Sequence, residues 1–161
     1  MTPEQKIREL LKVWVPCPED EHDNGIYRGI KMALQQFEEE DQLRYFKESD
    51  FECRCGCGKN EMDRGFLRLL DRSRHIAGVP FVITSGYRCI EHNATVSNIG
   101  TQSPHPKGFA ADVVARNSSD RWEIMMGMAM AGIRRIGINF DKKFIHCDND
   151  PSKPEGILFG Y

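Results

Sequence analysis

The chain has 161 residues, of which 40% are hydrophobic and 29% charged, and its formal net charge is −2. A chain of this size can bury a core without disulfides, and its charge gives no reason to expect nucleic acid or an anionic membrane surface as a partner. No stretch approaches the roughly 18 apolar residues of a membrane span, and the N-terminus has no apolar signal segment. We therefore expect a monomer with no nucleic-acid partner, no membrane span, no export signal and reduced cysteines, cytoplasmic at synthesis.

The N-terminal part of the chain has a helical pattern. Apolar residues recur at three- and four-residue steps over 3–13 and 25–40, and Pro16-Cys17-Pro18 breaks the pattern between them. The sequence therefore predicts a helical extension over residues 1–45, followed by a main domain over 46–161.

Within the main domain, the patterns predict helices and strands in mixed order. We expect a helix over 60–77, a buried strand over 80–84, a long surface loop over 89–108 and a strand over 110–115. A helix capped by Ser118 or Ser119 and stopped by Gly132 should follow, and then strands over 134–139 and 143–147. This order indicates an α+β domain with a small, mainly antiparallel sheet and helices on one side.

Two segments carry residue types that bind metals. The run from Ser103 to Asp112 places His105 in a loop and Asp112 on a strand. Downstream, His146 and Asp148 lie two positions apart in a strand, so their side chains should share one face. Two imidazoles and one carboxylate form a standard catalytic zinc shell, whereas a single histidine in a strand is more often an ordinary core or surface residue.

Taken together, the two segments resemble a known family. The pattern is Ser103-x-His105-x-x-Gly108-x-Ala110-x-Asp112 followed by His146. It is similar to the signature of zinc D-alanyl-D-alanine carboxypeptidases, a group that includes murein endopeptidases and the hedgehog signalling domain. The block Ile83–Arg88 with His92-Asn93 resembles the family's upstream block, and residues 51–58 resemble the opening of a subfamily found in phage lysis proteins and bacterial wall enzymes.

The resemblance implies a function and roles for particular residues. His105, Asp112 and His146 would bind zinc, Arg88 would hold a substrate carboxylate, and Ser103 would bind the substrate or orient the ligand loop. The activity implied is hydrolysis of peptide bonds in peptidoglycan stem peptides or cross-links that contain D-amino acids, as in a carboxypeptidase or an endolysin. The lack of an export signal fits a phage-type lysis protein or a virion-associated wall enzyme.

The sequence departs from the family at the catalytic base. Many relatives carry a histidine two residues before the last ligand or a glutamate three before it, where this chain has Phe144 and Lys143. Asp148 is our candidate base, with Asp141 behind it, and a frame in which Asp148 binds zinc while His146 is catalytic stays open. The missing base also leaves open a non-catalytic, zinc-containing module that binds wall peptide or a protein partner.

Cysteine spacing suggests a second metal site without establishing one. Cys53, Cys55 and Cys57 alternate, so in an extended strand their three sulfurs would share one side, and Cys89 is a candidate fourth ligand. Structural zinc sites usually separate their cysteines by two or more residues, which favours packed or free thiols here.

Two other pairs are expected to have no catalytic role. Cys147 and His146 are adjacent in a strand and should point to opposite faces, which disfavours a cysteine nucleophile. Arg134 and Arg135 are expected on a solvated surface.

Overall fold

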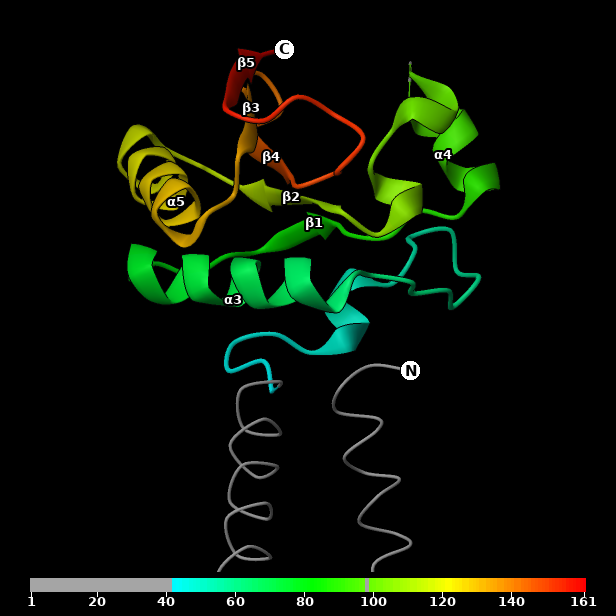
Figure 1. Ribbon diagram of the computed structural model, residues 1–161, viewed down its shortest axis with the longest axis horizontal. Coiled ribbons are helices and arrows are strands. Elements are labelled where there is room, and N and C mark those ends of the chain that lie inside the picture. The colour runs from blue at the N-terminus through cyan, green and yellow to red at the C-terminus, as the bar shows by residue number, and fades with distance from the viewer. Residues whose placement is uncertain (1–41, 98) are drawn as a thin grey trace, which may run out of the picture. The chain divides into compact units, whose positions relative to one another are not determined.

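The structure, a computed structural model, describes residues 42–97 and 99–161, and residues Leu43–Tyr161 form one compact unit. The helices expected over 3–13 and 25–40 lie outside the described residues. Leu43 and Phe46 already pack against the core of the compact unit. Elements are labelled as in Figure 1.

The described residues form a five-stranded sheet in the order β1-β2-β4-β3-β5 (Figure 1). Its strands are β1 Ile83–Ser85, β2 Ala110–Val114, β3 Arg135–Asn139, β4 Phe144–Asp148 and β5 Ile157–Gly160. Neighbouring strands run antiparallel except β3 and β5, which are parallel. The predicted α+β fold with a small, mainly antiparallel sheet is therefore confirmed.

Three α-helices lie within the described residues: α3 Arg64–Ala77, α4 Ile90–Val96 and α5 Ser118–Ala131. Helix α5 covers one side of the sheet and packs against α3, which runs beneath the β1 edge (Figure 1). Helix α4 lies on the opposite side of the sheet from α5 (Figure 1). The expectation that all helices share one side is therefore wrong for α4.

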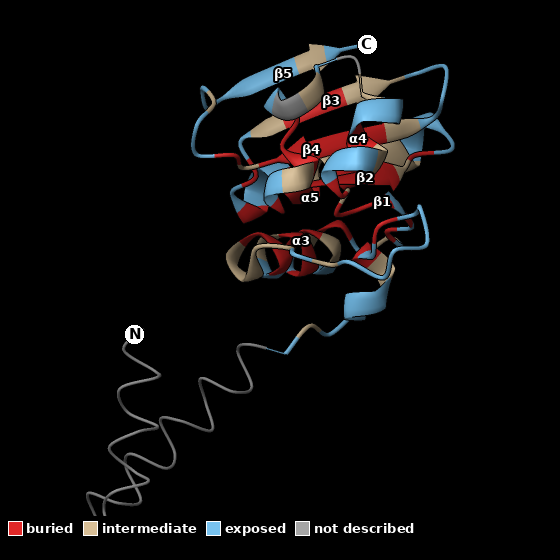
Figure 2. Ribbon diagram, turned by 90° about the vertical axis from the view of Figure 1, so that its right-hand side faces the viewer, coloured by how far each residue is buried: buried red, intermediate tan, exposed pale blue. Residues whose placement is uncertain are grey.

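Alternation along the two central strands separates the core from the site. Ala111 and Val113 of β2, and Ile145 and Cys147 of β4, are fully buried in the main hydrophobic core. That core also contains residues of α3 and α5, among them Phe66, Leu70, Ile124 and Met128. Because side chains alternate between the faces of a strand, the residues between them point to the other face. Figure 2 shows how the buried residues concentrate in the central strands, while β5 at the edge is largely exposed.

Helix α5 begins one residue earlier than the serines suggested. Asn117 is its N-cap, and its side-chain oxygen accepts a hydrogen bond from the backbone N–H of Asp120 at 2.8 Å. Gly132 ends the helix in the left-handed conformation, as predicted.

The prediction of a plain surface loop over 89–108 is wrong. This segment contains α4 and two 3-10 turns, Gly100–Gln102 and His105–Lys107. Cys89 is the N-cap of helix α4, and its sulfur accepts a hydrogen bond from the N–H of His92 at 3.4 Å. Cysteine is not among the usual N-cap residues, so no capping signal in the sequence predicted a helix here.

The other strands differ from prediction mainly at their ends. Strand β1 is shorter than 80–84 because its pairing with β2 runs only from Ile83 to Ser85. Strand β5 was not predicted; its residues are mostly exposed and lack the alternation of a half-buried strand. Among the described residues, no helix is both long enough and apolar enough to cross a bilayer.

Candidate functional site

Strand register brings two of the predicted ligands together. Asp112 of β2 lies directly opposite His146 of β4, and Oδ1 of Asp112 is 2.9 Å from Nδ1 of His146. Asp148 lies on the same face of β4, with Oδ2 at 3.0 Å from Nε2 of His146. The prediction that His146 and Asp148 share a face is confirmed.

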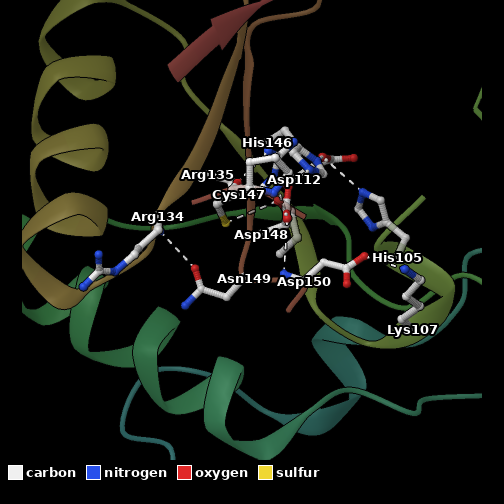
Figure 3. Close-up of polar contacts among 12 residues, drawn as sticks. His105, Lys107, Asp112, Arg134, Arg135, His146, Cys147, Asp148, Asn149 and Asp150 are labelled. Atoms are coloured by element: carbon white, nitrogen blue, oxygen red, sulfur yellow. Dashed lines mark hydrogen bonds and ion pairs between the residues drawn. The ribbon is translucent and has the colours of Figure 1, made fainter. Parts of the chain in front are cut away.

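His105 reaches the same place from a 3-10 turn. Its Nδ1 lies 2.7 Å from the carbonyl oxygen of Gly86. Because a carbonyl can only accept, Nδ1 carries the proton and Nε2 keeps its lone pair free. Nε2 lies 3.5 Å from Oδ1 of Asp112. Figure 3 shows His105 on its loop facing the residues on the strands.

A glycine makes this turn possible. Gly108 ends the turn with φ +79°, and a Cβ at this position would collide with the carbonyl oxygen of Glu61. The carbonyl of Gly108 also accepts a hydrogen bond from the N–H of Asp63 at 3.0 Å. The glycine of the sequence motif is therefore required by backbone conformation and by close packing.

The three residues fit a zinc ion. One ligand atom from each of His105, Asp112 and His146 lies within 4.8 Å of the others, and all three residues are buried. Zinc ligands at about 2.0–2.1 Å in tetrahedral geometry are about 3.4 Å apart, close to the measured separations of 2.9 Å and 3.5 Å. The hydrogen bond from His105 to Gly86 is the kind of outer contact that orients a ligating imidazole.

The charge state of the cluster also suits a cation. Burial raises the pKa of Asp112, but His105 and His146 outweigh it and hold that pKa below its usual range. Burial lowers the pKa of His105, which keeps this imidazole neutral. Hydrogen bonds to Asp112 and Asp148 raise the pKa of His146 against the effect of burial. The cluster thus contains an ionised carboxylate beside a neutral imidazole, which are the forms that bind a metal.

Arg88 contacts the other oxygen of Asp112. Its Nη2 lies 2.5 Å from Oδ2 of Asp112, and its Nε donates to Oγ of Ser85 at 2.7 Å. Oδ1 of Asp112 therefore faces the two histidines while Oδ2 faces the guanidinium.

All the predicted site residues line one pocket of about 640 Å³. They are Arg88, Ser103, His105, Asp112, His146 and Asp148. The lining also includes His92 and Val96 of α4 and, near the C-terminus, Phe159 and Tyr161. Burial, together with the charges of Asp112 and Asp148, raises the pKa of Tyr161 to about 12.

The sequence analysis missed Phe159 and Tyr161 because nothing in the local pattern marked this segment as part of a sheet. Phe159 belongs to β5, which reaches the site only through its parallel pairing with β3, where Gly137 lies opposite Phe159. The ring of Phe159 lies 6.2 Å from that of His146, measured between centroids.

The expectation that Arg135 lies on a solvated surface is wrong. Its Nε lies 3.2 Å and 3.3 Å from the two carboxylate oxygens of Asp148, and its side chain is only 15% exposed. Arg134 does lie at the surface, 3.4 Å from Glu155. Arg135 is directly opposite Asp148 in the β3–β4 pairing, which no local pattern could predict.

Asp148 is buried and ionised. Burial raises its pKa, but the hydrogen bond to His146 and the charge of Arg135 outweigh that effect and lower the pKa. Asp141, the reserve candidate for the base, lies exposed in the turn between β3 and β4.

An ion pair ties the His105 turn to the end of β4. Nζ of Lys107 lies 2.7 Å from Oδ2 of the buried Asp150, whose N–H donates to Oδ1 of Asp148 at 3.3 Å (Figure 3). The turn and the strand that supply the site are thus held by an ion pair between two residues that the motif does not specify.

Cys147 is excluded from chemistry by its position. It is fully buried in the core and does not line the pocket, and its sulfur donates to the carbonyl of Ala111 at 3.4 Å. Burial raises its pKa well above the usual range, so the thiol stays protonated.

Comparison with models of protein families identifies a match over most of the chain. The model of a family described as Peptidase M15 matches residues 44–148. That span contains every predicted site residue. A search of the curated proteins finds no match.

Proposed function

The chain belongs to the peptidase M15 family, a family of zinc metallopeptidases, and from this premise we propose that it hydrolyses peptide bonds of peptidoglycan. The substrates would be stem peptides or cross-links that contain D-amino acids, cut in the manner of a D-Ala-D-Ala carboxypeptidase or an endolysin. The observation that carries the proposal is the convergence of His105, Asp112 and His146 in a pocket that Arg88 also lines.

His105, Asp112 and His146 would hold the zinc ion. When bound, zinc lowers the pKa of a water ligand toward about 7 and polarises the scissile carbonyl. Gly86 fixes the tautomer of His105, and Arg88 fixes the orientation of the Asp112 carboxylate. These contacts favour a ligand set that is already in place before substrate arrives.

Asp148 is the proposed proton carrier. It is ionised, so it can accept the proton of the attacking water and pass it to the departing amine. Its contact with Nε2 of His146 also suits the alternative frame, in which Asp148 is a ligand and His146 acts on the proton.

The charges around the pocket favour an acidic peptide. Besides Arg88, the lining contains the cations Arg54, Arg135, Lys142 and Lys153. Stem peptides carry carboxylates, including the one at a terminal D-alanine, and a guanidinium binds such a group with two parallel hydrogen bonds. Ser103 lies buried in the same wall and would add a hydroxyl contact to the substrate or to the ligand loop.

Purified peptidoglycan and a synthetic stem peptide ending in D-Ala-D-Ala provide the test. We expect hydrolysis of at least one, its loss on treatment with a chelator, and its return when zinc is added. Mass spectrometry of the products then identifies the bond that is cut.

A His105→Ala/His146→Ala double variant is the control, and it should be inactive even with added zinc. If the wild-type protein with zinc binds peptidoglycan but cuts neither substrate, the chain is instead the non-catalytic binding module.

A further inference from the structure

Four cysteines lie close together apart from the histidine site, and the proposed hydrolysis uses none of their thiols. The sulfur atoms of Cys53, Cys55, Cys57 and Cys89 all lie within 4.8 Å of one another. Those of Cys53 and Cys55 are 3.4 Å apart, and those of Cys55 and Cys89 are 3.7 Å apart. Four sulfurs bound to zinc at about 2.3 Å in tetrahedral geometry are about 3.8 Å apart. We propose that these four cysteines bind a structural zinc ion, separate from the metal of the histidine site.

The backbone conformation allows cysteines separated by single residues to bind one ion, although structural zinc sites usually have wider spacing. The cysteine segment is a turn and not the strand that the alternation suggested. Gly56 and Gly58 have φ values of +85° and +70°, which curl the chain, and the N–H of Cys53 donates to the carbonyl of Lys59 at 2.9 Å. In this closed turn, cysteines separated by single residues can point at a common centre.

Hydrogen bonds around the cluster favour thiolates. The backbone N–H of Cys89 donates to the sulfur of Cys53 at 3.3 Å, and the N–H of His92 donates to the sulfur of Cys89 at 3.4 Å. Nδ1 of His92 lies 3.3 Å from the sulfur of Cys53. The two amide donors stabilise the negative charge that a metal-bound sulfur keeps.

The exposure of the four cysteines allows an ion to reach the cluster. Cys53 and Cys89 are buried while Cys55 and Cys57 are exposed, so an ion can enter from the surface side.

The position of the cluster indicates what the metal would do. It joins the turn to the start of α4, immediately after Arg88. Arg54, inside the turn, donates to the carbonyl of Ile83 at 3.0 Å and lines the pocket, as His92 does. The apolar cluster here is small, with Tyr87 and Met62 packed around two of the cysteines. Because little apolar surface is buried here, a zinc ion would stabilise this wall of the pocket.

Metal analysis of the full chain, purified without chelator, tests the proposal independently of hydrolysis. We expect two zinc ions per wild-type chain, and one in a Cys55→Ser/Cys57→Ser variant. Both substituted residues are exposed, so the rest of the fold should tolerate the change. The matched control is Cys147→Ala, which removes a core cysteine outside the cluster and should keep both ions.

Replacing zinc with Co²⁺ distinguishes the two sites by their ligands. Sulfur ligation gives an intense thiolate-to-cobalt charge-transfer absorption in the near ultraviolet, which a histidine–carboxylate site lacks. We expect this band in the wild type and in the His105→Ala/His146→Ala variant, and its loss in the Cys55→Ser/Cys57→Ser variant.

Absence of the band from wild-type protein loaded with Co²⁺ would overturn the proposal, even if the cysteine variant failed to fold. So would an intact mass lower by two hydrogens per cysteine pair in protein that holds a single zinc ion, since that result shows disulfides instead of metal. Hydrolysis plays no part in either measurement, so a failure of the proposed function would leave this test unchanged.

Discussion

Asp112 divides its two carboxylate oxygens between different partners. Oδ1 faces the two histidines, and Oδ2 is held by Arg88. A guanidinium in this position can act in two ways, by orienting the ligand and by offering its remaining donors to a substrate carboxylate.

Substitution of Arg88 separates these two actions. If Arg88 binds the substrate, Arg88→Ala should lower kcat/KM about tenfold or more without changing zinc content, because a charge-assisted bidentate contact is lost. Arg88→Lys should restore only part of the activity, since an ammonium is a point charge without the planar fork. Rates and metal content are to be measured on one preparation, and loss of zinc in Arg88→Ala would show that orienting Asp112 is its main role.

Asp148 contacts His146, Arg135 and the N–H of Asp150, and its position beside His146 suits either proton transfer or metal binding. Asp148→Asn keeps the shape of the side chain but removes its charge. If Asp148 carries the proton, activity should fall by about 10²–10⁴-fold with zinc retained. If it is a ligand, the same change should weaken zinc binding.

Zinc content and hydrolysis rate must be determined together for this variant, because neither alone separates the two roles. The conservative Asp141→Asn change on the exposed turn is the control and should alter neither quantity. Normal activity and normal zinc in Asp148→Asn would exclude both roles.

At the scale of the element, the start of α5 shows how one residue sets a helix boundary. Asn117 caps the helix by accepting from the N–H of Asp120, whereas Ser118 and Ser119 lie within its first turn and are exposed. Asn117→Ala should lower the free energy of unfolding by about 1 kcal/mol, because the N–H of Asp120 loses its partner.

Urea denaturation measures this difference. Ser119→Ala is the matched control and should change the free energy of unfolding by no more than about 0.5 kcal/mol, as for other exposed sites. A larger effect for Ser119→Ala than for Asn117→Ala would contradict this assignment of the cap.

At the scale of the whole molecule, the compact unit depends on residues at the predicted boundary between the N-terminal extension and the main domain. Phe46 is only 7% exposed and packs edge-on against Phe51, with ring centroids 5.4 Å apart. The N–H of Tyr45 donates to Oδ1 of Asp71 in α3 at 2.9 Å.

Truncation tests this boundary. A chain beginning at Leu43 should fold and bind zinc, whereas one beginning at Lys47 should be less stable by about 3–5 kcal/mol, the usual cost of removing a buried phenylalanine. The comparison uses urea denaturation of both chains with zinc bound. Equal stabilities would place the start of the domain after Phe46.

The sequence by itself determined those features that depend on short-range geometry. The alternation of side chains along β4 placed His146 and Asp148 on one face and Cys147 in the core, because successive side chains of a strand point to opposite faces. Gly132 ended α5 because a left-handed residue stops a helix. The order of helices and strands was enough to predict an α+β domain.

Only the tertiary structure decided which distant segments meet. The β3–β4 register placed Arg135 against Asp148, and the parallel pairing of β5 brought Phe159 to the pocket. The turn at Gly56 and Gly58 gathered cysteines that an extended chain would have kept apart. Register and turn conformation depend on long-range packing and hydrogen bonding, which the local sequence pattern does not contain.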